Sequence, residues 1–560
     1  MARIYIFYFL LVSMVAACGK GSSPTPAPPT PPVVPPPALI ALLVKINNET
    51  LVDANRYNVA LNAVVRCSFT APVNRATATA NISFAENSGA PLNFAVVYEN
   101  GDSTIVLQPA APLKNITQYK VTIFTGLKSV AGAGLSMQMF ANFFTKIDSS
   151  AKFPTISDNA LLDLVQRQTF KYFWDFAHPV SGLARERNTS GETVTSGGSG
   201  FGVMAIPVAI NRSFISRAEG LARMKKIVDF LKNTAQKFHG AFPHWLNGTT
   251  GIAVAFSTKD NAADLVETSF LIAGLLTARQ YFNDAGAEET ALRNDINSIW
   301  NNVEWDWFRK NNENVLYWHW SPAYTWEMNL PIRGWNECLV TYILGASSAT
   351  HSIPKAVYTS GFAGNNNFIN GNSYYGYQLP LGEEKGGPLF FSHYSFLGIN
   401  PTGLTDAYAN YATQTKNHSL INYTHCRLNP NNQFGYSQDC WGLTASDIQN
   451  GYTASSPTND IGVIAPTAAL SSFPYTPEES MKALKFFYYV LGDKIWKEYG
   501  FTDAFALKNT WFADSFLAID QGPIIVMIEN YRSGLIWNLL TSCPEVKTGM
   551  RALGFTAPYL

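Results

Sequence analysis

The chain has 560 residues, 47% of them hydrophobic, so it can bury more than one core, and its length predicts two to four domains. Lys plus Arg equals Asp plus Glu at 40 each, which leaves no net charge to attract nucleic acid and favours a neutral or weakly charged partner. Charged residues make up only 14% of the chain and aromatic residues 13%, a balance found in sugar-binding proteins and also in proteins with a Trp-rich core.

Residues 1–18, MARIYIFYFLLVSMVAAC, have the pattern of an export signal. Arg3 supplies the positive charge, residues 4–14 the apolar run and residues 15–17 the small side chains before a cleavage site. Because cleavage would fall directly before Cys18, the segment resembles a bacterial lipoprotein signal in which Cys18 is lipidated. An ordinary secretory signal and a retained anchor are the alternatives.

The Pro-rich residues 19–38 predict an extended spacer that holds the rest of the chain away from a lipid surface. No later segment has about 18 consecutive apolar residues, so we expect the lipid to be the only membrane attachment. These features predict a monomeric lipoprotein of the cell envelope. They leave open which membrane holds it.

Residues 39–148 predict a small all-β sandwich. Short β-branched or aromatic runs alternate with Gly, Asn, Pro and Asp, and they are VRCSFTAPV, ANISFAE, LNFAVVYE, STIVLQPA, QYKVTIFTG and MFANFFTK. The last part of this region resembles the bacterial Ig-like modules found beside secreted hydrolases. We expect a spacer or accessory module, with glycan binding as the alternative.

From residue 155 to residue 560 the pattern becomes helical, with apolar residues at a spacing of three to four. The predicted helices lie within residues 158–177, 216–238, 261–282, 288–305, 335–349 and 477–500. Long loops rich in Gly, Asn, Trp and Tyr separate them. This arrangement predicts a mainly α domain, an α/α toroid with a cleft at one end.

The remaining cysteines offer little for a metal. They are Cys67, Cys338, Cys426, Cys440 and Cys543. Only Cys426 and Cys440 are close enough in sequence to suggest a loop-closing disulfide, and an odd number leaves at least one thiol free. Neither a C-x-x-C pair nor an H-E-x-x-H motif occurs, so we expect no metal and no cofactor.

Three acids stand at the start of an otherwise apolar helical pattern, in KDNAADLVETSFLIAGLL. On a helix, Asp260, Asp264 and Glu267 share one stripe with Leu271 and Gly274, which predicts that they face an inner cleft. The alternative is that Asp260 is an N-cap and the other two are first-turn acids that suit the helix dipole.

A fourth acid, Glu337, follows Trp335 in PIRGWNECLVTYILG. Burial against aromatic rings raises the pKa of a carboxyl and suits a general acid, whereas the helix dipole favours ionisation of the first three acids. Pairing of Glu337 with Arg333 or another cation is the alternative. Carboxyls with such different pKa values are what glycoside hydrolysis requires.

Aromatic side chains in the loops around these acids are candidates for sugar stacking. They and one histidine form the predicted binding set, namely Trp245, Trp318, His319, Trp320, Tyr324, Trp326 and Trp335. Some of these rings must serve packing. We expect His319 to bind hydroxyls or to be structural, since no nucleophile motif accompanies it.

Three segments now carry a specific resemblance. KDNAADLVETSFLIAGLL, GWNE and ALKNTWFADSFLAIDQGPIIVMIENYRSGLIW are similar to the glucoamylase-like domain of glycoside hydrolase family 144, the bacterial endo-β-1,2-glucanases. The resemblance spans residues 155–555 and implies an (α/α)6 barrel that cleaves linear β-1,2-glucan with inversion and without a metal.

The resemblance also implies catalytic roles for Asp260, Asp264, Glu267 and Glu337. It further includes Asp520 and Glu529, which we expect in substrate binding or structure. We expect Glu337 to protonate the leaving oxygen and one of the other three acids to activate water. A glycosidase of other specificity, a toroidal polysaccharide lyase and a non-catalytic glycan-binding lipoprotein are the alternatives.

Overall fold

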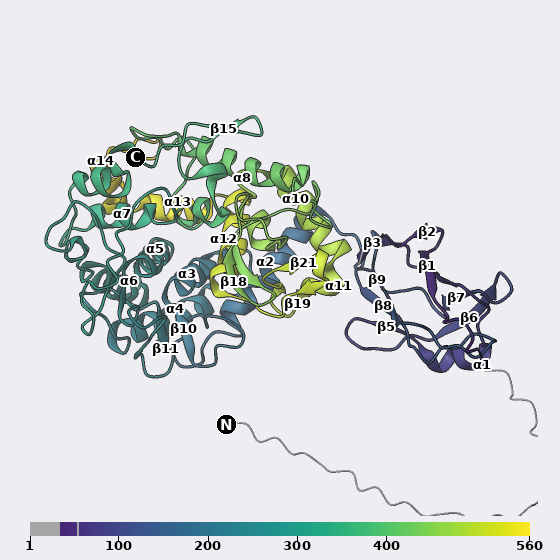
Figure 1. The fold of residues 1–560 in the computed structure, drawn as a ribbon. Helices are drawn as coiled ribbons and strands as arrows, with labels where there is room; N and C mark the ends of the chain where they lie inside the picture. Colours follow the sequence, from purple (N-terminus) through teal and green to yellow (C-terminus); the bar gives the residue numbers. More distant parts are fainter. Residues whose placement is uncertain (1–33, 53–54) are drawn as a thin grey trace, which may run out of the picture.

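The computed structural model describes residues 34–52 and 55–560, which form an all-β domain beside a larger helical domain (Figure 1). The predicted export signal, Cys18 and most of the Pro-rich spacer lie outside the described residues. Among the described residues, none of the helices has the length and hydropathy that crossing a bilayer requires.

The β-domain consists of two sheets around a shared core. One has the order β2-β1-β4-β7-β6 and the other β3-β9-β8-β5, with Phe84, Tyr119 and Phe143 buried between them. The strands are β1 (Ala41–Ile46), β2 (Glu49–Thr50), β3 (Asn55–Val59), β4 (Val65–Phe69), β5 (Ile82–Glu86), β6 (Phe94–Glu99), β7 (Thr104–Pro109), β8 (Gln118–Ile123) and β9 (Met139–Thr145). Each of the six predicted runs contains a strand, whereas β1 to β3 were not predicted.

Aromatic packing joins the two domains. The ring of Tyr57 on β3 stacks on Phe144 at 4.4 Å and lies 5.3 Å from Phe434 of the helical domain. Ile116 of the β-domain packs into a core of the helical domain, and the Lys152 N–H donates to the Tyr489 carbonyl at 2.7 Å. The domains therefore share an apolar contact as well as a chain connection.

Residues 155–560 form mainly helices, as predicted. They are α2 (Asp158–Trp174), α3 (Ser196–Asn211), α4 (Arg217–Asn233), α5 (Leu265–Tyr281), α6 (Ala287–Asn301), α7 (Leu339–Ser347), α8 (Tyr411–Leu428), α9 (Pro466–Leu470), α10 (Pro477–Lys485), α11 (Gly492–Ile495), α12 (Ala518–Arg532), α13 (Leu535–Ser542) and α14 (Pro544–Leu553). Short antiparallel strand pairs lie in the segments between them. Those near the site are β10 (Thr193–Thr195) with β11 (Trp245–Asn247) and β12 (Ala253–Val254), β13 (Ala263–Asp264) with β14 (His319–Trp320), β17 (Ala445–Ile448) with β18 (Gly451–Ala454), and β21 (Phe505–Ala506) with β22 (Trp511–Phe512).

Glycines let α3 and α5 pack with their backbones in close contact. A Cβ at Gly200 would lie 2.3 Å from the Phe270 carbonyl oxygen, and one at Gly274 would lie 2.3 Å from the Gly200 carbonyl oxygen. Helix α3 also contacts α12, and all three lie in the middle of the domain (Figure 1). Only glycine at these positions permits this approach.

Two helices start later than the sequence pattern indicates. Helix α5 begins at Leu265, so Asp260 lies in the preceding turn and Asp264 is the N-cap; the predicted helical stripe through both aspartates was therefore wrong. Helix α7 begins at Leu339, which places Glu337 just before it. In both cases a turn, rather than a helix face, directs the acid.

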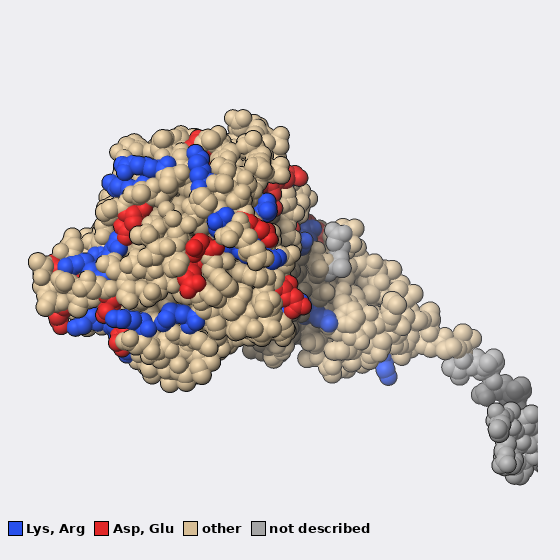
Figure 2. All heavy atoms as spheres, turned by 90° about the vertical axis from the view of Figure 1, so that its left-hand side faces the viewer, with Lys and Arg blue, Asp and Glu red and all other residues tan. Residues whose placement is uncertain are grey.

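The visible surface carries both signs of charge, and the described cysteines are free thiols. Figure 2 shows Lys and Arg interspersed with Asp and Glu on one face of the helical domain. Cys426 and Cys440, considered above as a disulfide, are both buried free thiols, as are the other three cysteines in the described part of the chain.

Candidate active site

A cleft of about 440 Å³ opens in the helical domain, and two of the four predicted catalytic acids line it. Glu267 comes from the first turn of α5 and Glu337 from the turn before α7. Aromatic walls and further polar groups surround them, among them Trp245, Phe256, Trp318, Tyr394, Tyr452, His244, Glu186 and Arg187.

Asp264 is fully buried at the base of the cleft and caps α5. Its Oδ1 accepts the N–H groups of Val266 at 3.0 Å and of Glu267 at 2.9 Å. Such caps stabilise a helix start by about 1 kcal/mol. The side chain of Asp264 therefore helps to place Glu267.

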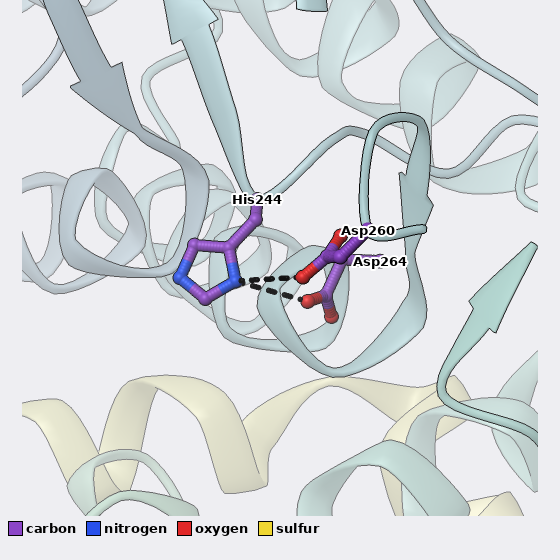
Figure 3. A group of neighbouring side chains, drawn as sticks. All are labelled: His244, Asp260 and Asp264. Carbon is purple, nitrogen blue, oxygen red and sulfur yellow. Dashed lines mark ion pairs between the residues drawn. The ribbon is translucent and has the colours of Figure 1, made fainter. Parts of the chain in front are cut away.

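Two histidines face the two aspartates. Nδ1 of His244 lies 3.2 Å from Asp264 Oδ2 and 3.7 Å from Asp260 Oδ2, as Figure 3 shows. Nε2 of His319 lies 3.2 Å from Asp260 Oδ2 and 3.4 Å from Asp264 Oδ2. His319 is brought there by β14, whose residue pairs with Asp264 on β13.

These contacts shift the pKa values of the whole group. Burial alone would lower the pKa of His319, but hydrogen bonds and charges from both aspartates outweigh it and raise that pKa to about 9. Burial likewise opposes protonation of His244, yet the charge of Glu267 and the two aspartates raise its pKa well above the ordinary value. Burial would raise the pKa of Asp264, but the two histidines hold it well below its usual range. The cluster therefore holds protonated histidines beside an ionised aspartate at neutral pH.

Glu267 has one oxygen fixed and one directed toward His244. Its Oε2 accepts the Gly197 N–H at 2.8 Å and lies 3.4 Å from the Thr195 hydroxyl. Its Oε1 lies 3.9 Å from His244 Nε2. Burial raises the pKa of Glu267, and the charge of His244 opposes that rise.

Glu337 has the pKa of a general acid. Burial is the main cause that raises the pKa of Glu337 to about 7. Its own backbone N–H lowers this pKa, whereas the charges of Glu267 and Asp264 raise it. Its carbonyl oxygen accepts the Ser395 hydroxyl, which anchors the turn. A carboxyl with this pKa can be protonated at neutral pH and still donate its proton readily. Among the described residues no ion pair joins Glu337 to Arg333, whose guanidinium donates to the Ser360 carbonyl.

The same cluster also offers donors for a cation. The Nδ1 of His244 and one carboxylate oxygen each of Asp260 and Asp264 lie within 4.8 Å of one another. A bound cation would have to displace the His244 proton, which already balances the carboxylates. The residues fit a metal less well than they fit a charge-paired network.

A second group of acids lies behind the cleft wall. Burial raises the pKa of Asp503 to about 7. Burial and the neighbouring Asp503 raise that of Asp520 well above its usual value. Burial raises the pKa of the Tyr394 hydroxyl, and the nearby Asp520 raises it further. Asp520 thus lies next to the cleft, but its carboxyl does not line it.

Glu529 lies at the other end of α12 and is structural. Its carboxylate is fully buried and accepts both Arg212 Nε at 2.7 Å and Arg212 Nη2 at 3.0 Å. Asn211, Gln166 and Ser533 also donate to it. With every acceptor position occupied, Glu529 is not available to a ligand in the cleft.

The predicted aromatic set divides in the same way. Trp245 and Trp318 line the cleft. Trp335 is only 5% exposed and packs on Phe396 and Tyr411. Trp320 and Trp326 pack against Trp307, and neither they nor Tyr324 line the cleft. Trp320, Tyr324, Trp326 and Trp335 therefore lie outside the cleft, while His319 contacts the acids.

Several residues of the site were missed from the sequence. His244 precedes Trp245 in GAFPHWLNG, but nothing in its spacing links it to acids more than fifteen positions later. Arg187 comes from a loop and Tyr452 from the short strand β18, and neither belongs to a motif. Only the fold brings these side chains to the cleft.

Comparison with known proteins identifies both domains. Residues 329–544 match the family described as "Putative glucoamylase". Residues 48–145 match the bacterial Ig-like domain family.

Three relatives are informative. An endo-β-1,2-glucanase from Chitinophaga pinensis, solved with sophorotriose and glucose, is 52% identical, with a TM-score of 0.71 over 72% of this chain and 100% of that chain. A β-1,2-glucanase structure from Parabacteroides distasonis is 37% identical, with a TM-score of 0.70 over 92% of this chain and 73% of that chain. An exo-β-1,2-glucooligosaccharide sophorohydrolase (non-reducing end) from P. distasonis is 46% identical over 428 residues, 72% of this chain. The chain covers only 59% of the length of that last protein.

Proposed function

This chain belongs to glycoside hydrolase family 144, the glucoamylase-like family, and carries an N-terminal bacterial Ig-like domain; from this we propose that it hydrolyses linear β-1,2-glucan. The observation that carries the proposal is Glu337, a carboxyl with a pKa of about 7 on the wall of a cleft that Glu267 also lines. The reaction needs one carboxyl that donates a proton and a second that accepts one from water.

In the proposed reaction, protonated Glu337 donates its proton to the glycosidic oxygen of the leaving sugar. Glu267 accepts a proton from the attacking water, because it is the only one of the other three predicted acids that lines the cleft. Asp264 positions Glu267 through the helix cap, and His244 stabilises the negative charge on it. Asp260 acts through the two histidines.

We propose endo action, with release of short sophoro-oligosaccharides. The endo-acting relative is 52% identical, and the match covers its whole chain. The exo-acting relative is matched over only 59% of its length, so parts of it have no counterpart here. Exo release of sophorose is therefore the second candidate.

The finer fold and the location belong to the same proposal. Helices α3, α5 and α7 contact one another in succession, and α12 contacts both α3 and α9. This succession supports a ring of inner helices and an (α/α)6 barrel. We further propose export of the chain and lipidation at Cys18, which would place the enzyme where extracytoplasmic glucans occur.

The first test compares substrates. Protein lacking residues 1–38 is incubated with linear β-1,2-glucan and, in parallel, with β-1,3-, β-1,4- and α-1,4-glucans, and products are separated by chromatography. A ladder of oligosaccharides from the β-1,2 polymer alone is expected. Sophorose as the only early product would show exo action, and release from another glucan would contradict the substrate assignment.

The second test concerns the acid. Glu337→Gln should lower kcat at least about a hundredfold, as loss of a general acid does, while the unfolding transition stays in place. The matched control is Glu478→Gln, an exposed acid in the first turn of α10, which should keep full activity. Near-normal turnover in the Glu337 variant would rule out its assigned role.

A further inference from the structure

A second hollow lies next to the cleft and shares two residues with it. This outer pocket, of about 620 Å³, is lined by residues 187–189, 447–448, 451–452 and 511–515. Arg187 and Tyr452 line both the outer pocket and the cleft. We propose that the outer pocket is an additional subsite for glucosyl units of the same glucan chain, an inference that rests on the proposed function.

Two hairpins form its walls. In β17–β18, Asp447 pairs with Tyr452, and in β21–β22, Ala506 pairs with Trp511. Their tips meet where Asn509 Nδ2 donates to Gln449 Oε1 at 3.4 Å. The pocket is thus built on paired strands, which hold its side chains in place.

The lining has the chemistry of a sugar site. Trp511 and Phe512 are partly exposed rings, and the Tyr452 ring is 49% exposed between the two hollows. Thr189 adds an exposed hydroxyl, and Asp514, whose carboxylate is paired with Lys497, adds exposed acceptor oxygens. Rings combined with a few polar groups are what a neutral sugar requires, and the volume lies within the range of roughly 300–1,000 Å³ for ligand pockets.

Charge in the outer pocket is balanced, which favours an uncharged ligand. Arg187 Nη1 donates to both carboxylate oxygens of Asp447, at 3.3 and 3.2 Å, and Arg187 Nε donates to Glu186. The Ser515 hydroxyl donates to the same Asp447. Arg187 is therefore held by an acid on each side at the border of the two hollows. Because Tyr452 lines both hollows, we infer that one glucan chain passes across it.

The test uses Trp511→Ala in the full enzyme with two probes, linear β-1,2-glucan and the shortest β-1,2-glucooligosaccharide that the wild type cleaves. We expect kcat/KM on the polymer to fall about tenfold through loss of one stacking ring, and kcat/KM on the short substrate to change less than twofold. Trp511→Phe should recover most of the polymer activity. Tyr531→Ala removes an exposed ring at the far end of α12 and should change neither value.

The outcomes separate this inference from the proposed function. Equal loss on both substrates, or no loss on either, would overturn the outer subsite while leaving β-1,2-glucan hydrolysis established by the wild-type rates. Failure of wild type to cleave linear β-1,2-glucan or any β-1,2-glucooligosaccharide would overturn both. The Tm of each variant is measured alongside the assays. If Trp511→Ala loses both activity and Tm while Trp511→Phe loses neither, the activity loss would reflect lost packing, and the subsite would be overturned.

Discussion

Single ionisable groups decide what the cleft can do. Beside the cleft, two protonated histidines lie next to the buried, ionised Asp264, so its negative charge is compensated. Glu337 is outside this balance: burial and the like charges of Glu267 and Asp264 raise its pKa more than its own backbone N–H lowers it. The same protein interior therefore keeps one carboxyl ionised and another protonated.

The pKa of Glu337 predicts the alkaline limb of activity. A general acid works only while protonated, so kcat/KM should fall roughly tenfold per pH unit above about pH 7. The measurement is the pH profile of kcat/KM on β-1,2-glucan, with stability at each pH checked by assay at neutral pH after incubation. A profile that stays flat to pH 9 would contradict the assignment.

Two buried histidines outside the cleft predict loss of stability in acid. Burial lowers the pKa of His393 to about 3 and that of His418 to about 4. Both rings are therefore neutral in the fold, whereas in the unfolded chain they bind protons below about pH 6.5, so unfolding is favoured as the pH falls. At pH 5 each should reduce the free energy of unfolding by about 2 kcal/mol relative to neutral pH.

Urea unfolding at pH 7 and pH 5 tests this. His393→Gln should lose less stability between the two pH values than wild type does, whatever its stability at pH 7. The carboxylates titrate in both proteins and so serve as an internal reference. The same pH dependence in both proteins would show that His393 has no part in it.

The acids of the site could be selected from the sequence, whereas their contacts with basic residues could not. Asp260, Asp264, Glu267 and Glu337 stand out because carboxylates are rare in apolar segments, and the structure brings them together. His244 could not be predicted, since its role depends on a distance in space that no local pattern encodes. Glu529 looked equivalent to Asp520 in the sequence, but only the structure shows the Arg212 that neutralises it.

Among the elements, the pair α3 and α5 shapes the site most directly. Helix α3 supplies the Gly197 N–H to Glu267, and α5 supplies Glu267 itself. A Cβ at Gly197 would lie 2.5 Å from Glu267 Oε2. The close packing that glycine permits is thus part of how the acid is held.

Gly200→Ala should be destabilising by several kcal/mol. Its Cβ would lie 2.3 Å from the Phe270 carbonyl oxygen, and backbone cannot move aside without separating the helices. Gly220→Ala on α4 is the matched control, because its Cβ would meet Ile210 Cδ1, the end of a flexible side chain, at 2.5 Å. Chemical denaturation should therefore show a much smaller effect for Gly220→Ala, and equal effects would refute the backbone argument.

The same glycines explain why α3 was not predicted. SGGSGFG reads as a loop by propensity, and Pro207 adds a further helix breaker. Tertiary packing overrides both signals, since every residue from Ser196 to Ala209 is buried. Helix starts at α5 and α7 were placed early for a related reason: apolar residues continue through the preceding turns.

At the scale of the whole molecule, the mainly α class and the all-β sandwich were predictable from periodicity and spacing, and the Ig-like character of the sandwich from a resemblance. The contact between them was not, because Tyr57 and Phe434 are ordinary aromatic residues in their own segments. The number of helix pairs in the ring stays a prediction.

The proposed lipid anchor predicts where the protein is found. Cys18→Ser in the full-length chain should move the enzyme from the membrane fraction to the soluble extracytoplasmic fraction without changing its specific activity. The control is Cys67→Ser, a buried thiol in the β-domain, which should leave the protein in the membrane fraction. Retention of the Cys18 variant in the membrane would favour an uncleaved anchor.

The cap made by Asp264 ties the start of α5 to the reactive carboxyl of Glu267. Fraying of this first turn would release the Val266 and Glu267 amides to solvent and move the carboxyl at the same time. Hydrogen–deuterium exchange at these two amides should therefore follow the same denaturant dependence as loss of turnover. If that turn opens before the rest of the fold, the enzyme would lose activity before it unfolds globally. The rate of turnover would then measure the local stability of the start of α5.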